Sequence, residues 1–396
     1  MKILTCHNFY QSDGGENMVF RTEQEILRKA GHEVIEYSRQ STDTEGSGLA
    51  ARAGMFVSGF YSRRTVREVR ALVDRERPDV AIIQNVFPLL SPSLYHALHG
   101  RVPMVQLVFN YRILCPNAEF YTNGANCERC IGGNTIHAVR FQCYRQSRVF
   151  SAWYAGIIGL HRALRTWHLV DRFIVADRFL LRKLVEGGLP GDRIRVNSNP
   201  FDVDQYPRSD ESGDYALFVG RFTRAKGVLT LVRAFAQANL PRRLVMVGDG
   251  ESMSEIQSII REHGLADRVE LAGRVFGDKM RQLMAGSQFV VVPSEWYDNT
   301  PMTIYQAFST GKPVIASRMS GVMEDVIDGE DGILFTPGDP ADLARKMEQV
   351  AADPELRKRL GERARQKAEA QWSAPAHQSR LTAILEEVAG VAASSR

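Results

Sequence analysis

The sequence predicts an α/β protein made of two doubly wound domains in tandem. Two observations favour this class: short apolar runs alternate with helical periodicity in both halves of the chain, and a polar, proline-containing stretch at 201–214 separates the halves. A length of 396 residues suits two to three domains of roughly 150 residues each. With 44% hydrophobic and 24% charged residues, the composition excludes disorder, collagen and coiled coil as the main architecture.

The first half has six apolar runs that are typical of parallel strands. They read KILTC, EVIEY, DVAIIQ, PMVQLVF, RFIVA and RIRVN. The loop HNFYQSDGGEN follows the first run, and a helix is expected from there to about Ala30. We expect this domain to span 1–200 and to contain a cysteine-rich insertion at about 110–165.

The second half begins the α/β pattern afresh. Strands are expected at YALFVG, RRLVMVGDG, RVELAG, QFVVVPS and KPVIAS, in a domain spanning 215–374. The chain is helical and charged from about Ala341, and 375–396 is expected to form a last helix. Ligands of open α/β sheets lie beyond the carboxyl ends of the strands, so chemistry is expected there, in a cleft between the domains.

Charge is distributed unevenly along the chain. The net charge is +4, with a net of +8 in 1–200 and −4 in 201–396. An arginine-rich first half suits phosphates or anionic lipid, but no basic motif of a nucleic-acid reader is present, so no nucleic-acid partner is expected. No apolar run reaches the roughly 18 residues of a transmembrane helix, and the N-terminus lacks a signal-peptide pattern, which predicts a cytoplasmic protein.

Three glycine-rich or basic loops follow predicted strands and precede predicted helices. They contain Gly14 and Gly15, then Arg221 and Lys226, and then Gly248 within VGDGES. Glycines let a ligand approach the backbone, and two cations near a helix start can clamp a diphosphate. The alternatives are plain turns and solvated surface charges.

A fourth loop, at 293–317, leads from an apolar strand into a helix that starts near Thr300–Met302. Asp298 lies in the loop and Gln306 about one turn into the helix, so both can face one cleft. The N–H groups of Met302 and Thr303 would be unpaired at the helix start, and Gln306 could hold a diol such as a ribose.

These segments together resemble glycosyltransferase family 4, whose members are retaining, nucleotide-sugar-dependent enzymes of the GT-B fold. The resemblance rests on VGRFTRAKG, VGDGES, LAGRV, VPSEWYDNTPMTIYQAFSTGKPVIAS and EDGILFTPGDP, in that order. FNYRILCPNAEFYTNGANCERC and LVDRFIVADRFLLRKLVEGGLP are similar to one bacterial polysaccharide-type branch. The resemblance implies a GT-B fold of two Rossmann-like domains, with the last helix returning to the first domain.

The family pattern implies roles for individual residues. The diphosphate of the donor is expected to contact Arg221, Lys226 and Gly15. Its nucleobase is expected to contact Arg274 and Val275, and its phosphate and sugar are expected to contact Met302 and Thr303. The two family glutamates fall on Asp298, at the sugar hydroxyls, and Gln306, at the ribose. On the acceptor side, Phe109 replaces a histidine that commonly precedes Asn110 in this branch.

The resemblance implies transfer of a sugar with retention from a nucleotide-diphosphate-sugar to a glycan or lipid-linked acceptor, in surface polysaccharide or lipopolysaccharide assembly. UDP or GDP is favoured over ADP, and catalysis is expected to need no cofactor. The departures at Asp298, Gln306 and Phe109 keep two alternatives open: a weak or inactive homologue that binds a sugar nucleotide or a partner, and a sugar-nucleotide epimerase on the same fold. A dehydrogenase is disfavoured because no strand is followed by the full glycine fingerprint.

Four cysteines cluster within 29 residues, at Cys115, Cys127, Cys130 and Cys143. The spacing Cys-x11-Cys-x2-Cys-x12-Cys would permit a structural zinc site with four thiolate ligands. The alternatives are four ordinary thiols in a long insertion and an iron–sulfur cluster.

The segment Arg140–Arg165 mixes five arginines with aromatic and aliphatic residues. Such a stretch could lie on an anionic membrane surface, as a peripheral contact at the inner membrane face. The alternative is a core helix with a solvated basic face.

Overall fold

A computed structural model of the chain describes residues 1–10, 15–40, 49–209, 213–240 and 243–394. The protein divides into two compact units, and each is described by itself. The first unit comprises Met1–Phe120, Glu128–Pro200 and Ala374–Arg396, and the second comprises Tyr121–Cys127 and Phe201–Ser373. None of the helices in these ranges is both long and apolar enough to cross a membrane.

The first unit is built on a parallel six-stranded sheet in the order β2-β1-β3-β4-β7-β8. The strands are β1 Lys2–Phe9, β2 Glu33–Gln40, β3 Val80–Ile83, β4 Met104–Val108, β7 Arg172–Val175 and β8 Ile194–Val196. All six apolar runs of the first half therefore form strands, as predicted. The central strands β3 and β4 are buried along their whole length, which is why their sequences are apolar except for Gln106 of β4.

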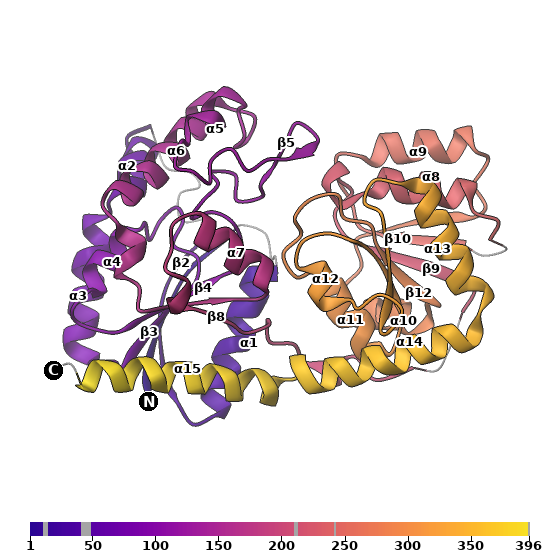
Figure 1. Ribbon diagram of the computed structural model, residues 1–396. Coiled ribbons are helices and arrows are strands. Elements are labelled where there is room, and N and C mark those ends of the chain that lie inside the picture. Colours follow the sequence, from indigo (N-terminus) through magenta and orange to yellow (C-terminus); the bar gives the residue numbers. More distant parts are fainter. Residues whose placement is uncertain (11–14, 41–48, 210–212, 241–242, 395–396) are drawn as a thin grey trace. The chain divides into compact units, whose positions relative to one another are not determined.

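Helices α1 Gly15–Lys29 and α15 Ala374–Ser394 contribute to the core on one face of this sheet. Leu27 of α1 and Leu381 and Leu385 of α15 share one apolar cluster with strand residues such as Ile82 and Val105. Figure 1 shows α15 running along the first unit beside β3. The unit also contains α3 Arg63–Glu76, α4 Ser93–Leu98 and α7 Arg178–Glu186. The N-caps Ser62 and Asp177 start α3 and α7 by accepting hydrogen bonds from the backbone N–H groups of Thr65 and Leu180.

Three further helices of the first unit, α2 Leu49–Phe60, α5 Ile136–Arg140 and α6 Arg148–Ala163, gather at one side of it (Figure 1). Glycines permit close packing of α2 on α6: a Cβ on Gly59 would lie 2.4 Å from the Trp153 ring, and one on Gly156 would lie 3.1 Å from the Phe60 ring. The Trp153 indole N–H also donates to the Phe56 carbonyl at 2.8 Å. Of the four clustered cysteines, Cys143 lies between α5 and α6.

The second unit repeats the architecture with a parallel sheet in the order β11-β10-β9-β12-β13-β14. The strands are β9 Tyr215–Val219, β10 Arg243–Val247, β11 Val269–Gly273, β12 Phe289–Val292, β13 Val314–Ser317 and β14 Gly332–Phe335. The first five match the predicted runs. The sixth, β14, lies in the EDGILF stretch, which the sequence analysis used only as part of the family pattern.

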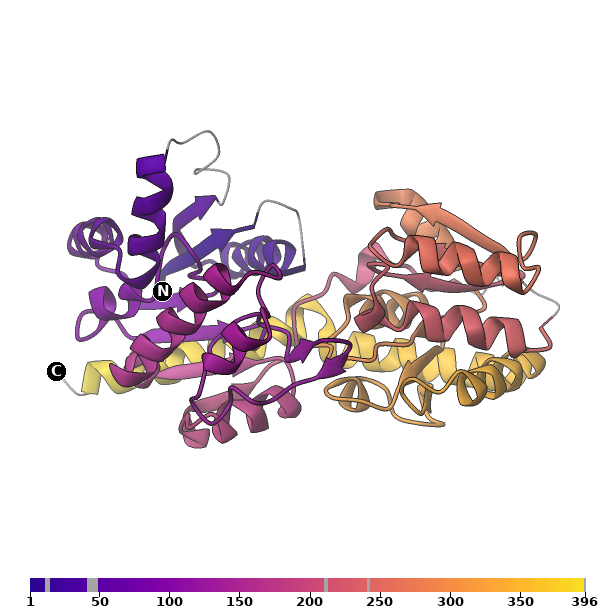
Figure 2. The same ribbon diagram turned by 90° about the horizontal axis from the view of Figure 1, so that it is seen from above.

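Helices cover both faces of the second sheet, as Figure 2 shows. One core cluster joins strand residues to α8 Val228–Gln237, α9 Met253–Glu262 and α13 Pro340–Ala352. The other joins them to α10 Gly277–Gly286, α11 Met302–Thr310, α12 Val322–Asp325 and α14 Pro354–Lys367. Asp339 and Asp353 cap α13 and α14, each just before a proline. The unit also includes a short hairpin of two strands with two residues each, β5 Tyr121–Thr122 and β6 Ala125–Asn126.

Candidate functional site

The loops that follow β9 and β12 lie side by side at the carboxyl edge of the second sheet. β9 and β12 are neighbours in the sheet, with Leu217 opposite Val290. The loops are joined by a hydrogen bond from the Glu295 N–H to the Ala225 carbonyl at 2.8 Å. The loop after β10 is tied in by the Phe222 N–H, which donates to the Asp249 carbonyl at 2.9 Å. All three of the loops that the sequence analysis singled out in this half therefore converge, as parallel strand ends require.

The centre of this edge is an ion pair between Lys226 and Asp298. The Lys226 Nζ lies 2.5 Å from the Asp298 Oδ2, and the Ser294 hydroxyl donates to the same oxygen at 2.8 Å. The side chains of Lys226 and Asp298 are 20% and 6% exposed, so the pair is largely removed from water. The ammonium also lies 5.4 Å from the centre of the Trp296 ring. The pair therefore fixes the position of the Lys226 ammonium. Removing either partner would cost free energy of unfolding, because the other charge would be left largely buried and unpaired.

Helix α11 begins directly after this loop. Thr303 donates its hydroxyl to the Val219 carbonyl at the end of β9, at 3.2 Å, which ties the helix start to the sheet edge. Met302 is half-buried. Gln306, one turn further on, is hydrogen-bonded to the Tyr206 hydroxyl, and burial raises the pKa of Tyr206. The amide of Gln306 is thus oriented by a side chain that the sequence analysis did not single out.

The glycines of this edge are required by close backbone contacts. A Cβ on Gly248, at φ +145°, would lie 1.8 Å from the Gly220 carbonyl oxygen. A Cβ on Gly227, at φ +66°, would lie 1.8 Å from the Pro293 carbonyl oxygen. Both positions are closed to any other residue, because the obstructing atoms are backbone. Gly248 therefore has a structural reason to be glycine, whatever it contacts in a ligand.

The remaining predicted residues of the second unit lie on the rims of the loops. Arg221 is exposed, on the same loop as Lys226. Arg274 is 70% exposed and lies 3.9 Å from the Asp249 carboxylate, whereas Val275 is buried. Phe276, which the sequence analysis did not select, follows at the N-cap of α10 with 78% of its side chain exposed. An aromatic side chain at a capping position makes no capping hydrogen bond, so Phe276 is not explained by the stability of α10.

The first unit has its own polar edge where β4 ends. The Asn110 side-chain N–H donates to a Glu16 carboxylate oxygen at 2.5 Å, and the Asn110 Oδ1 accepts from the Arg112 N–H at 2.9 Å. A cavity of about 30 Å³ is lined by these three residues together with Phe109 and others. Gly15 starts α1 just before Glu16, and a Cβ there would meet nothing within 4 Å. Gly14 lies outside the described residues.

Arg112 is the most unusual of these side chains. Two of its nitrogens, Nε and one Nη, are buried and have no hydrogen-bond partner among the described residues. Its guanidinium instead lies over aromatic rings, 5.1 Å from the centre of Tyr154 and 5.8 Å from that of Phe87. Arg112 stands two residues after Asn110 in the quoted FNYRILCP segment, which was the signal available in the sequence.

The predicted cysteine ligands do not form a metal-binding group in the structure. Cys115 and Cys130 are buried, Cys127 and Cys143 are half-buried, and Cys127 belongs to the second unit. The Cys115 thiol donates to the Asn117 side-chain oxygen at 2.9 Å, and burial raises its pKa. Within the described ranges, no three histidine, cysteine, aspartate or glutamate side chains come together as metal ligands. The zinc site therefore stays a prediction.

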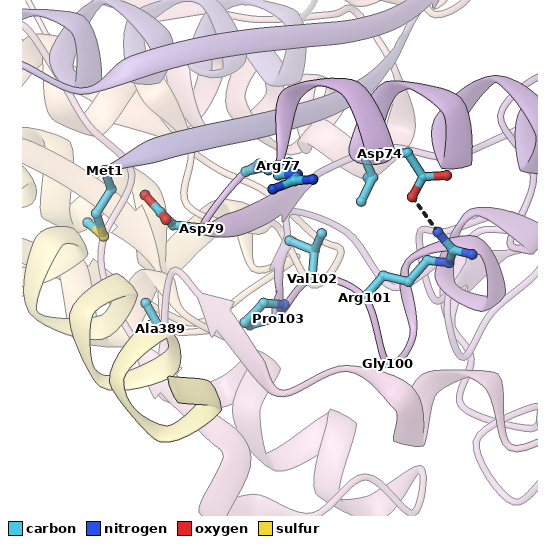
Figure 3. Close-up of a pocket in the computed structure, with 11 residues that line it drawn as sticks. Met1, Asp74, Arg77, Asp79, Gly100, Arg101, Val102, Pro103 and Ala389 are labelled. Carbon is cyan, nitrogen blue, oxygen red and sulfur yellow. Dashed lines mark hydrogen bonds and ion pairs between the residues drawn. The ribbon is translucent and has the colours of Figure 1, made fainter. Parts of the chain in front are cut away.

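A broad hollow of about 1050 Å³ lies at the opposite edge of the first sheet. It is bordered by the residues that precede β1, β3 and β4, among them Met1, Asp79 and Pro103, as Figure 3 shows. Its arginine at position 101 is paired with Asp74 at 2.7 Å. Because ligands of open α/β sheets bind at the carboxyl ends of strands, this hollow is not where the predicted chemistry would take place.

Residues 202–367 match the family model described as glycosyl transferases group 1. A glycosyltransferase of Methanocaldococcus jannaschii is 37% identical over 152 residues, which are 38% of this chain and 42% of that protein. A lipopolysaccharide core biosynthesis glycosyltransferase of Rhizobium meliloti is 33% identical over 158 residues, 40% of this chain and 45% of that protein. The chain thus spans less than half the length of these curated relatives.

Solved structures resemble the whole chain. HepE of Anabaena, determined in complex with UDP, has a TM-score of 0.69 and 19% identity, covering 98% of this chain and 100% of that one. A sucrose-phosphate synthase of Thermosynechococcus elongatus has a TM-score of 0.71 and 19% identity, covering 99% and 100%. At this identity the likeness concerns the fold.

The likeness to these structures and the two parallel six-stranded sheets therefore show that the protein has the GT-B fold, as predicted. Residues 202–367, within its second unit, match group 1 glycosyltransferases and are similar to named glycosyltransferases, so the expected resemblance to glycosyltransferase family 4 is confirmed for that region.

Proposed function

We propose that the protein is a retaining glycosyltransferase that moves a sugar from a nucleotide-diphosphate-sugar to a glycan or lipid-linked acceptor. The observation that carries the proposal is the Lys226–Asp298 pair beside the start of α11, within the region that matches group 1. An ammonium next to a helix N-terminus suits a diphosphate. UDP or GDP is the proposed carrier, and the UDP in the similar HepE structure supports the uridine nucleotide.

In the proposed reaction, the bond between the anomeric carbon and the β-phosphate oxygen breaks while the acceptor oxygen bonds to the same face of that carbon. The acceptor hydroxyl gives its proton to the departing diphosphate. The chain's contribution is to stabilise the growing negative charge on that diphosphate, through Lys226, Arg221 and the N–H groups of Met302 and Thr303. Asp298 fixes the Lys226 ammonium, and the family resemblance gives it the further role of binding the sugar hydroxyls.

Gln306 and Asp298 support a second candidate, a homologue that binds a sugar nucleotide with little or no transfer. In the unliganded structure both side chains are already engaged, Asp298 by Lys226 and Ser294 and Gln306 by Tyr206. A ligand must share or replace these contacts. Gln306→Glu, which restores the family residue, separates the candidates. A large rise from a negligible wild-type transfer rate supports the second candidate, and a substantial wild-type rate that does not rise supports an active enzyme.

Calorimetry with UDP, GDP and ADP, and then with their sugars, tests the donor site directly. We expect micromolar binding of one nucleotide, and a loss of more than about tenfold in affinity for Lys226→Ala. Arg208→Ala is a matched control, because it removes an exposed cation that pairs with Glu362 on the same unit. Equal affinity for Lys226→Ala and wild type would contradict the diphosphate site. Transfer with inversion at the anomeric carbon, seen by NMR of the product, would contradict retention, and free sugar released without an acceptor would favour the epimerase.

We further propose surface polysaccharide or lipopolysaccharide assembly as the setting, at the cytoplasmic face of the membrane. This is supported by the relative that acts in lipopolysaccharide core biosynthesis and by a similar solved structure, a lipopolysaccharide outer core galactosyltransferase. Acceptors of this kind are attached to lipid, so an enzyme of this setting would need a membrane contact.

A further inference from the structure

We propose that one face of the first unit, made by the outer side of α6 with the neighbouring parts of α2 and α5, binds to anionic phospholipid bilayers. We call it the α6 surface. It extends the membrane location proposed above, and rests on that proposal only in assuming a bilayer-attached acceptor. The binding itself is independent of any sugar donor.

The outward side of α6 is apolar, which is the reverse of an ordinary surface helix. The buried side comprises Ser151, Trp153, Tyr154, Ala155, Ile157, Ile158 and His161. The opposite side presents Val149, Ala152, Leu160 and Leu164, which fall on one side of the helix and form one apolar stripe. Gly156, which lies between them, is in contact with the Phe60 ring of α2. Val149, Leu160 and Leu164 are 67%, 40% and 51% exposed, and no polar side chain interrupts the stripe.

The neighbouring helices enlarge the apolar area. Val57 of α2 is 71% exposed and Ile136 of α5 is 66% exposed, and Tyr61, just after α2, is 43% exposed. Both helices pack directly on α6, as the Trp153–Phe56 hydrogen bond and the Thr135 hydroxyl donating to the Ala155 carbonyl show. Of the twelve exposed large hydrophobic side chains in the described part of the chain, six belong to this surface. Clustering of this degree marks an interaction surface rather than scattered exposure.

The charges around the stripe are of one sign. Residues 129–170 contain six arginines and no aspartate or glutamate. Arg145 and Arg148 flank the start of α6, Arg165 follows its end, and Arg140 ends α5; all four are exposed. Arg162 is different, because its guanidinium turns inward and donates to the Cys130 carbonyl at 3.0 Å. The alternative of a core helix with a solvated basic face does not describe α6 fully, because its exposed face is apolar and the basic residues stand at the ends of that face. The alternative of a membrane contact is taken up next.

This combination fits a bilayer with anionic headgroups. Aliphatic side chains can enter the region between headgroups and acyl chains, while arginines at the rim pair with phosphates. A protein partner or a second copy would need matching carboxylates, and 129–170 offers none to a symmetric contact between copies. Charge complementarity thus selects the lipid surface.

The test is co-sedimentation of the full chain with vesicles of phosphatidylcholine and phosphatidylglycerol at equal proportions, against vesicles of phosphatidylcholine alone. We expect binding to the mixed vesicles that weakens strongly between 0.1 and 0.5 M salt. Each arginine near an anionic surface contributes about fivefold in partition coefficient, so Arg145→Glu/Arg148→Glu should weaken binding at least about 30-fold. Val149→Asp and Leu160→Asp test the apolar stripe separately, and each should weaken binding about tenfold or more.

Arg75→Glu/Arg182→Glu is the matched control, because it makes the same charge change at exposed arginines elsewhere on the first unit. It should bind almost as wild type does. Equal loss with this control would show attraction by net charge alone and would overturn the α6 surface. So would absence of binding to the mixed vesicles, or a dimer in sedimentation velocity that Leu160→Asp converts to a monomer. Nucleotide affinity measured on the same variants shows that they are folded, so a failure here is distinguishable from a failure of the donor site.

Discussion

The Lys226–Asp298 pair allows a prediction whose size follows from its burial. Lys226→Met removes the ammonium and leaves the Asp298 carboxylate, 6% exposed, with Ser294 as its remaining side-chain donor. Removing one partner of a buried pair costs about 3–5 kcal/mol. Because Lys226 is itself 20% exposed, we expect the low end, about 3 kcal/mol of the free energy of unfolding of the second unit.

Differential scanning calorimetry measures this loss. For a unit of this size, 3 kcal/mol corresponds to a fall in midpoint of about 6–12 °C. The endotherm of the second unit is the one that the bound nucleotide raises. The double variant Lys226→Met/Asp298→Asn replaces the stranded charge with a neutral amide that Ser294 can still reach, and it should regain at least half of the loss.

Arg224→Met supplies the comparison, because its ion pair with Glu255 at 2.7 Å is exposed on both sides, at 63% and 43%. That pair should contribute no more than about 1 kcal/mol. The reasoning is refuted if Lys226→Met lowers the midpoint no further than Arg224→Met does, or if the double variant is as unstable as the sum of its single changes.

Four more outcomes are expected. Gly227→Ala should destabilise the second unit by more than about 3 kcal/mol in urea titrations, since its Cβ would lie 1.8 Å from the Pro293 carbonyl oxygen; a near-wild-type midpoint would contradict this. Gly15→Ala should leave stability within about 0.5 kcal/mol, because a Cβ there meets open space, yet weaken nucleotide affinity about fivefold if the donor approaches that backbone; unchanged affinity would remove Gly15 from the site. Burial lowers the pKa of His7 to about 4. The stability that neutral His7 contributes is therefore complete above about pH 6.5 and falls by about 3 kcal/mol as the pH is lowered towards 4. His7→Gln should flatten that part of the curve of stability against pH, and a curve identical to that of wild type would count against this explanation. If the cysteines bind zinc, elemental analysis should find about one zinc per chain and Cys127→Ser should lower stability, whereas a metal-free protein of equal stability would exclude the site.

The strands were predictable because the sheets are parallel and covered on both faces. β3, VAII, and β12, FVVV, are wholly buried, and so their sequences carry no polar residue. The hairpin of β5 and β6 escaped prediction for the opposite reason, since two-residue strands such as Tyr121–Thr122 have no period to detect. The mixture of arginines and apolar residues in helix α6 was noticed in the sequence. Which side of the helix faces outward depends on where α2 and α5 pack, and the sequence of α6 alone does not contain that information.

The site shows the same division. The sequence analysis predicted that Lys226 and Asp298 each contact the sugar donor, because of the loops in which they lie. Their mutual contact joins residues 72 positions apart and arises from the adjacency of β9 and β12 in the sheet. Tyr206, which orients Gln306, lies in the stretch expected to be a linker and offered no motif of its own.

The backbone crowding at Gly248 and Gly227 has a consequence for redesign. With those two positions unavailable to side chains, new chemistry at this edge of the second sheet has to come from neighbouring loop positions, such as residues 294–300, where Ser294 and Asp298 stand, and the exposed Arg221 and Arg274. A library that randomises these loop positions while sparing the two glycines would vary the side chains around the edge without disturbing the backbone contacts that hold it.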